Sequence, residues 1–414
     1  MTPARARRWL AWSAALALSI AATPANAAHK VFVTSVTGSG DLSTWPDAGS
    51  NAGLAAGDAI CQARATAANL ANPDQYVAWL SDDANDAYCR VTGFSGKRSA
   101  NCGQPSRPTT GGPWVRFDKF PFSPSLTALT SQHVVYAPIV FDENGDPAPR
   151  TTFTGTNEDG TSDFESPQEN CQGWTSSSAA VSTTAGDALR SSGSWTSSAS
   201  PTCSEAESLI CIQKGSGNPL PPFDNPGVPA FVSESGGGGN LSTRSGANGQ
   251  TGLAAADAVC QSEAAEHGIW GAQFFRAWLS DSTTSAIDRI TGNGPWVRLD
   301  GVEIAASKSD LTGALIAPLN VSSTGFYFGN DATWTGSTPA GLSGAATCAD
   351  WTSSSSSDLG QIGTVNFAAS GWGGSAGGVE CDAGFSLYCF CDQTLIFGDG
   401  VERGDLTAWT SHLP

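Results

Sequence analysis

Oxygen-bearing side chains in two short stretches of this chain have the types and spacing for calcium binding. Carboxylate and amide oxygens are the ligands that Ca²⁺ prefers, and loops usually supply them. We therefore predict a calcium site with oxygen ligands at Asp142, Asn144, Asp146 and Asp163. A plain turn is the alternative for the first stretch, because Asn144-Gly145 is a hairpin signal.

The second stretch also predicts a ligand-binding loop, formed by Asn157, Glu158 and Asp159. Two tryptophans add a different chemistry, since an exposed indole can stack on a sugar ring. Trp195 and Trp372 lie in segments rich in Gly and Ser, which are typical of loops. We expect them to be either sugar contacts or core residues.

Catalytic and zinc chemistry find little support in the residue pattern. The four histidines do not follow a zinc-ligand spacing. Glycoside hydrolysis requires a pair of carboxylates at one site. Carboxylates are abundant here, but no pair is marked by a motif and retained in both halves of the chain. The prediction is a non-enzymatic protein without a zinc site, and a secreted hydrolase is the less favoured alternative.

The elements that must position these residues occur twice along the chain. LAAGDAICQ at 54–62 recurs as LAAADAVCQ at 253–261, AWLSD begins at Ala78 and again at Ala277, and GPWVR begins at Gly112 and again at Gly294. Such self-similarity indicates a duplicated unit. Alanine-rich runs predict helices at 54–70 and 253–267. Short apolar runs predict strands at 31–35, 114–117, 209–212, 231–233 and 387–390, and the fold class is α+β.

Domain boundaries follow from the repeats and from composition. A basic start and an apolar run ending in Ala25-Asn26-Ala27 predict a signal peptide at 1–27, cleaved near Ala27. We expect a first domain at 28–214, a Pro/Gly linker at 215–229, a second domain at 230–394 and a C-terminal tail at 395–414. The first domain carries a 17-residue insertion, and Cys89 and Cys102, which have no counterparts in the second domain, are expected to pair there.

Charge and cysteine content restrict the compartment and the partners. The formal net charge of −18 argues against nucleic acid and anionic membrane surfaces, which are held mainly by Lys and Arg. No segment after the signal peptide is long and apolar enough to predict a transmembrane helix. The 11 cysteines are typical of an exported chain, and the odd number leaves at least one unpaired.

The ordered motifs resemble those of the endostatin domain and its bacterial relatives, which share the C-type lectin-like fold. The resemblance rests on five motifs in order: a helix with Asp and Cys, A-W-L-S, an aromatic residue two positions before a Gly, C-x-x-W, and a closing cysteine pair. The first copy matches them at Asp58/Cys61, Trp79/Ser81, Phe153/Gly155, Cys171/Trp174 and Cys203/Cys211. The second copy matches at Asp257/Cys260, Trp278/Ser280, Trp334/Gly336, Cys348/Trp351 and Cys381/Cys389. The resemblance implies two tandem C-type lectin-like domains.

The resemblance also implies a nested disulfide pattern, in which the first cysteine of each copy pairs with the fourth and the second with the third. The implied pairs are Cys61–Cys211, Cys171–Cys203, Cys260–Cys389 and Cys348–Cys381, which leaves Cys391 unpaired. A buried thiol or a bridge to a second chain are the two expectations for Cys391, so the protein is expected to be a monomer or a Cys391-linked dimer.

Together these observations predict a secreted or cell-surface recognition protein that binds a glycan or a surface protein through its loops. Two sites on one chain would raise the apparent affinity for a multivalent surface. A structural surface or matrix component that needs no small ligand is the alternative.

Overall fold

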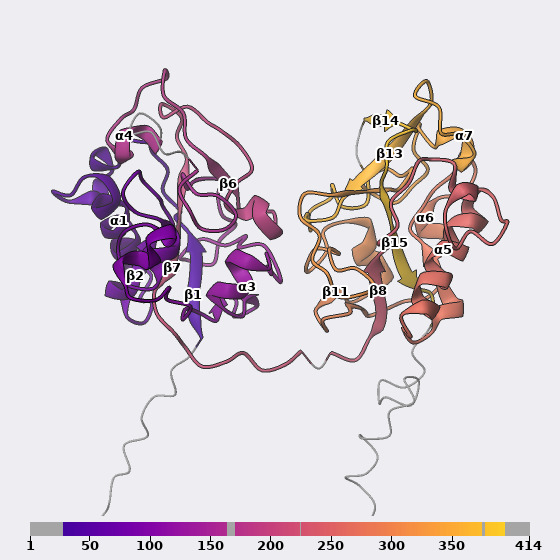
Figure 1. Cartoon of the computed structure of the whole chain (residues 1–414), viewed down its shortest axis with the longest axis horizontal. Coiled ribbons are helices and arrows are strands. Elements are labelled where there is room, and N and C mark those ends of the chain that lie inside the picture. The colour runs from indigo at the N-terminus through magenta and orange to yellow at the C-terminus, as the bar shows by residue number, and fades with distance from the viewer. Residues whose placement is uncertain (1–27, 164–169, 224, 375–376, 394–414) are drawn as a thin grey trace, which may run out of the picture.

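The computed structural model describes residues 28–163, 170–223, 225–374 and 377–393, and it contains two bodies of mixed helix and strand joined by an extended segment (Figure 1). The predicted signal peptide and the predicted tail at 395–414 lie outside the described residues. Within the described part of the chain, no helix has the length and apolar character needed to cross a membrane.

The N-terminal half folds around a seven-stranded sheet with the order β4-β3-β1-β7-β5-β6, in which β2 also pairs with β7. Its strands are β1 (His29–Val33), β2 (Tyr76–Ala78), β3 (Trp114–Val115), β4 (Pro121–Ser123), β5 (Thr151–Phe153), β6 (Ala185–Asp187) and β7 (Ser208–Gln213). Its helices are α1 (Gly53–Ala67), α2 (Ala87–Val91), α3 (Leu126–Ser131) and α4 (Asn170–Trp174), with short 3-10 helices at Leu42–Thr44, Pro46–Ala48, Pro73–Gln75, Arg98–Gly103 and Ser192–Trp195.

The C-terminal half has an eight-stranded sheet with the order β11-β10-β8-β15-β12-β13-β14, in which β9 also pairs with β15. Its strands are β8 (Val228–Val232), β9 (Phe275–Ala277), β10 (Trp296–Arg298), β11 (Glu303–Ala305), β12 (Ala332–Trp334), β13 (Leu359–Thr364), β14 (Gly378–Glu380) and β15 (Ser386–Cys391). Its helices are α5 (Gly252–Glu266), α6 (Ala286–Arg289) and α7 (Cys348–Trp351), with 3-10 helices at Leu241–Thr243, Ala272–Phe274 and Lys308–Thr312.

The predicted α+β class is confirmed, and the predicted elements differ from the observed ones mainly at their ends. Helices α1 and α5 begin one residue before the predicted starts and end before the predicted ends. The opening strands β1 and β8 start earlier than predicted, because His29 and Val228 already pair with Trp114 and Trp296 of the parallel neighbouring strands.

Five disulfides cross-link the two halves internally. The longest spans join α1 to β7 through Cys61–Cys211 and α5 to β15 through Cys260–Cys389. The remaining bonds are Cys171–Cys203, Cys348–Cys381 and, within the insertion, Cys89–Cys102. These are the pairs that the cysteine order and the resemblance lead one to expect. Cys391 is a free, buried thiol, which favours the buried-thiol expectation over a bridge to a second chain.

The C-x-x-W motifs form a left-handed turn in both halves. Cys171, Gln172 and Trp174 have φ angles of 51°, 54° and 67°, and Cys348 to Trp351 have positive φ angles throughout. Residues with a Cβ adopt this region at a cost of roughly 1 to 2 kcal/mol each. The disulfide at the start of each turn and the buried tryptophan at its end hold the chain in this conformation.

The two halves also contact each other through a buried polar cluster. The Ser191 main-chain amide donates a hydrogen bond to the Asn366 carbonyl at 2.9 Å, and the Asn366 side chain donates to the Ser194 hydroxyl at 2.9 Å. Asn320 donates to the Ser192 hydroxyl at 3.1 Å. Both asparagines are fully buried, so these bonds satisfy polar groups that water cannot reach.

Candidate functional site

A serine in each half connects the motifs that the sequence repeats. The Ser81 carbonyl accepts the Trp174 indole N–H at 2.8 Å, and the Ser81 hydroxyl accepts the Ala87 amide at 2.9 Å. In the C-terminal half, Ser280 accepts the Trp351 indole at 2.7 Å and the Ala286 amide at 2.8 Å. These buried indole hydrogen bonds connect segments that are distant in the sequence, so both serines have a structural role.

A second shared contact joins the main helix to the strand that follows it. Asp58 on α1 accepts the Ala78 amide at 2.9 Å and pairs with Arg90, whose guanidinium also donates to the carbonyls of Ala78 and Leu80. Asp257 and Arg289 make the same set of bonds around Ala277 and Leu279. The aspartate of the repeated motif is therefore a structural residue.

The predicted loop Asn157-Glu158-Asp159 borders a polar hollow of about 500 Å³ in the N-terminal half. Three segments that are distant in sequence meet here: the insertion, the end of α3 and the turn at 157–161. The lining is Arg98, Ser99, Arg107, Thr130, Ser131, His133, Asp159 and Thr161. Guanidinium, imidazole and hydroxyl groups dominate this lining, so it suits a ligand that accepts and donates several hydrogen bonds.

Arg98 on one side of the hollow is held by an ion pair, whereas Arg107 on another side has none among the described residues. The Arg98 guanidinium lies 3.1 Å from the Asp159 carboxylate, donates to the Ser131 hydroxyl at 3.1 Å and stacks over the Tyr88 ring at 4.6 Å. Arg107 is exposed, and no hydrogen bond or ion pair ties it to the described part of the chain. Its charge is therefore available to a ligand.

The remaining residues of the predicted loop divide between structure and surface. The Asn157 amide side chain donates to the Ser162 carbonyl at 3.3 Å and so stabilises its own turn. Glu158 is half exposed, and its carboxylate lies 3.8 Å from the His133 imidazole. Glu158 and Asp159 therefore remain candidates for ligand contact, while Asn157 positions them.

The insertion is held in place by one buried carboxylate, that of Asp86. It accepts the Arg98 amide at 2.7 Å and the Ser162 amide at 2.9 Å, and it lies 3.3 Å from the Lys97 ammonium. The Cys89–Cys102 disulfide closes the same segment. Sequence reasoning did not single out Asp86, Arg98, Arg107 or His133, although Arg98 and Arg107 lie in the insertion that distinguishes the two copies.

The carboxylates of the predicted calcium ligands do not converge on one point. Asp142 accepts the amides of Asn144 and Asp146 at 2.8 and 3.0 Å, which is the geometry of a tight turn. Asp163 accepts a hydrogen bond from Thr184 instead. Among the described residues, no three His, Cys, Asp or Glu side chains form a group that could hold a metal. Calcium binding remains a prediction that this geometry does not support.

Of the two alternatives for Trp195 and Trp372, burial supports the core residue and contradicts the sugar contact. Trp195 and Trp372 are 1% and 0% exposed, and their rings pack at 5.0 Å against Trp79 and Trp278. The Gly- and Ser-rich segments that carry them look like surface loops in sequence, but they fold over the sheet. The indoles fill the core, which leaves no ring face for a sugar.

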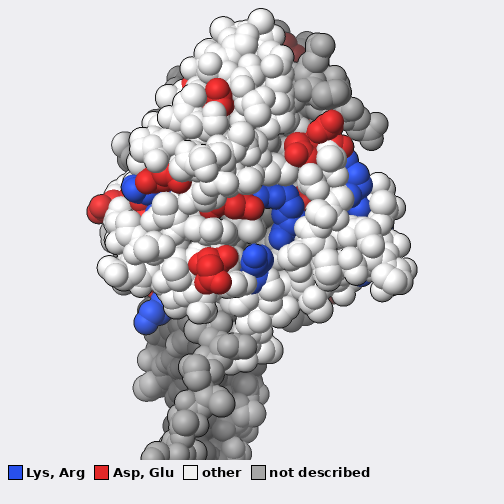
Figure 2. Space-filling model, turned by 90° about the vertical axis from the view of Figure 1, so that its left-hand side faces the viewer, with Lys and Arg blue, Asp and Glu red and all other residues white. Residues whose placement is uncertain are grey.

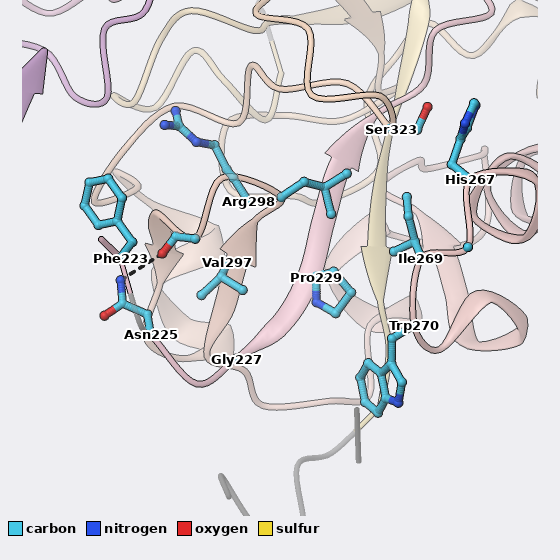
Figure 3. Close-up of a pocket in the computed structure, with 13 residues that line it drawn as sticks. Phe223, Asn225, Gly227, Pro229, His267, Ile269, Trp270, Val297, Arg298 and Ser323 are labelled. Atoms are coloured by element: carbon cyan, nitrogen blue, oxygen red, sulfur yellow. Dashed lines mark hydrogen bonds between the residues drawn. The ribbon is translucent and has the colours of Figure 1, made fainter. Parts of the chain in front are cut away.

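A different hollow, of about 380 Å³, lies in the C-terminal half beside the linker (Figure 3). Figure 3 shows Pro229, Val297, Ile269 and Trp270 along it, while the Asn225 amide donates to the Gly301 carbonyl at 2.9 Å. This hollow is more apolar in character than the one at the insertion. Its described lining includes the His267 imidazole, the Arg298 guanidinium and the Ser323 hydroxyl.

Charged side chains are sparse on the face of the molecule shown in Figure 2, where acidic and basic groups alternate across a largely uncharged surface. No protein-family model matches the chain, and no curated protein matches it.

Proposed function

We propose that this chain is a secreted, non-enzymatic recognition protein of two tandem endostatin-like domains with the C-type lectin-like fold, and that the hollow at the insertion binds a glycan. A surface protein is the other ligand class that the same loops could recognise. Five disulfides support export, because such bonds form and persist in oxidising compartments.

Matching features of the two halves support the tandem arrangement. The strand orders correspond element by element from β4 to β6 and from β11 to β13. Each half places a cysteine of its main helix against its last long strand, and each contains the same serine–tryptophan and aspartate–arginine contacts. A single folding unit used twice accounts for all of these correspondences.

The unpaired charge of Arg107 is the observation that carries the ligand proposal. It lies in a hollow whose other groups are hydroxyls, an imidazole and the Arg98–Asp159 pair. Sugars are bound through many hydrogen bonds to such groups, and a guanidinium offers several donors in a fixed plane. The equivalent insertion is missing from the C-terminal half, so we assign the primary site to the N-terminal half.

Glycan arrays and matrix-protein surfaces, probed with the mature protein with and without a chelator, test this function. We expect binding that Arg107→Ala weakens by about tenfold or more, which corresponds to the loss of one charged hydrogen bond. Lys214→Ala is the matched control, because it removes the same charge outside this hollow.

Failure of the wild-type protein to bind either array would count against the recognition function. An equal loss in Arg107→Ala and Lys214→Ala would instead place the interaction outside the hollow. Loss of binding with the chelator would revive the calcium prediction, since no other part of the site requires a cation.

A further inference from the structure

A third hollow, of about 550 Å³, lies where the linker crosses the edge of the N-terminal sheet. Its walls are largely apolar. They are formed by Val115 of β3, Phe120 and the first residue of β4, Pro121, and by the linker run 220–223. Volumes of this order are typical of pockets that enclose small molecules. The rigid proline pair within the linker run gives the hollow a preformed wall.

Two lysines, Lys30 and Lys119, interrupt this apolar lining, and no described acidic residue lines the hollow. Within the described residues, neither ammonium has a carboxylate at ion-pair distance. The nearby Asp118 is held by Arg116, at 2.6 Å. The Lys30 ammonium instead lies 5.0 Å from the centre of the Phe117 ring. Burial and the neighbouring Lys119 charge lower the pKa of Lys30, and the charge of Asp118 opposes this shift only in part.

The start of the mature chain adds to this positive character. Ala28 lines the same hollow, and the signal peptide is predicted to be cleaved after Ala27. Cleavage there would create a free α-amino group on Ala28. The hollow would then carry three cationic groups beside an apolar wall, in a chain whose formal net charge is −18.

The C-terminal half provides an internal comparison. The strand pair β8 and β10 repeats the register of β1 and β3, so that Pro229 occupies the position of Lys30 and Val297 that of Val115. Gly301 follows Asp300 as Lys119 follows Asp118, and Figure 3 shows Pro229 and Val297 in the resulting hollow. The apolar wall is thus kept while both lysines are absent, so the charges are not needed to build the fold.

We propose that the hollow lined by Lys30 and Lys119 binds a small amphipathic anion, with an apolar body and one carboxylate. The apolar part would cover Val115, Phe120 and the linker, and the carboxylate would lie between the ammonium groups. This site is separate from the hollow at the insertion, so it does not depend on the glycan-binding function.

Calorimetric titration of the mature, full-length chain with sodium decanoate, below its micelle concentration, tests the proposal. We expect saturable binding of one equivalent, and no comparable binding of decyltrimethylammonium, which has the same chain and the opposite charge. The double variant Lys30→Ala/Lys119→Gly should bind decanoate at least about tenfold more weakly. Glycine suits position 119, where φ is 70°, and it is the residue that the C-terminal half has there.

The matched control is Lys214→Ala/Lys308→Ala, which removes the same charge away from this hollow and should bind decanoate like the wild type. Equal melting temperatures of the two double variants would show that both are folded, and Lys30→Arg should keep most of the binding if charge is what matters. The proposal would be overturned by absent wild-type binding, by equal affinity for the cationic amphiphile, or by equal losses in the two double variants.

Discussion

The indole N–H of Trp174 donates to the main-chain carbonyl of Ser81 at 2.8 Å, across 93 residues of sequence. Trp351 and Ser280 make the same contact at 2.7 Å. This bond ties the left-handed C-x-x-W turn to the segment that follows the second strand. The tryptophan of the repeated motif is therefore a structural residue in both halves.

Trp174→Phe should lower the free energy of unfolding by about 1 to 3 kcal/mol, because it leaves the buried Ser81 carbonyl without its donor and removes core volume. Chemical denaturation of the oxidised protein measures this change. Trp270→Phe is the control, since Trp270 is only partly buried and its indole has no hydrogen bond to the described residues. Equal effects of the two substitutions would contradict the role of the Trp174 hydrogen bond.

Asp257→Asn should destabilise the C-terminal half by about 2 to 4 kcal/mol, because Asp257 is largely buried and pairs with both Arg276 and Arg289. Asp58→Asn should cost less, about 1 to 3 kcal/mol, since the Asp58 side chain is 28% exposed and Arg90 is its one ion-pair partner among the described residues. Thermal denaturation compares the two, with the exposed Asp74→Asn as control. A larger cost at Asp58 than at Asp257 would argue against this ranking.

Glu263→Gln should stabilise the protein at neutral pH. Burial is the main cause that raises the pKa of Glu263 above its usual value, and the Glu234 charge adds to it. Hydrogen bonds from the Ser323 hydroxyl and the Glu234 amide and the charge of His267 oppose the shift but do not cancel it. A raised carboxyl pKa contributes stability below the unfolded pKa of about 4.3, and this contribution is lost as the pH rises through the folded pKa. The ionised form is therefore the costly one, even with Arg244 nearby.

The gain from Glu263→Gln should be on the order of 1 kcal/mol at neutral pH and should shrink at about pH 4, where the wild-type carboxyl is protonated. Denaturation curves of both proteins at the two pH values measure it. Glu266→Gln, on the exposed side of the same helix, is the control. A stability gain that does not change with pH would point to a cause other than titration.

Cys391 should be unreactive in the folded protein. Burial raises the pKa of its thiol to about 11, and only the thiolate reacts with disulfide reagents. We expect no labelling near neutral pH in native buffer, one labelled thiol per chain in denaturant, and a monomer on a non-reducing gel. A disulfide-linked dimer or rapid native labelling would favour the structural-component alternative.

The amino-acid sequence alone determined the repeat, the helical and strand segments, the mixed α+β class and the cysteine order. These features depend on local periodicity and on identical spacing, which are visible without a structure. The turn at Asn144-Gly145 was also foreseeable, since its signal lies within a few residues.

Tertiary structure decided which residues are exposed and which of them meet. Trp195 and Trp372 have the sequence surroundings of loop residues, yet packing of distant segments buries them. Arg98, His133 and Asp159 line one hollow although they are distant in sequence, and Asp86 ties the insertion to Ser162, 76 residues further along the chain. Lys30 and Lys119 share a hollow because β1 pairs with β3 and the linker returns across that edge. Such contacts depend on long-range packing, which local sequence patterns do not record.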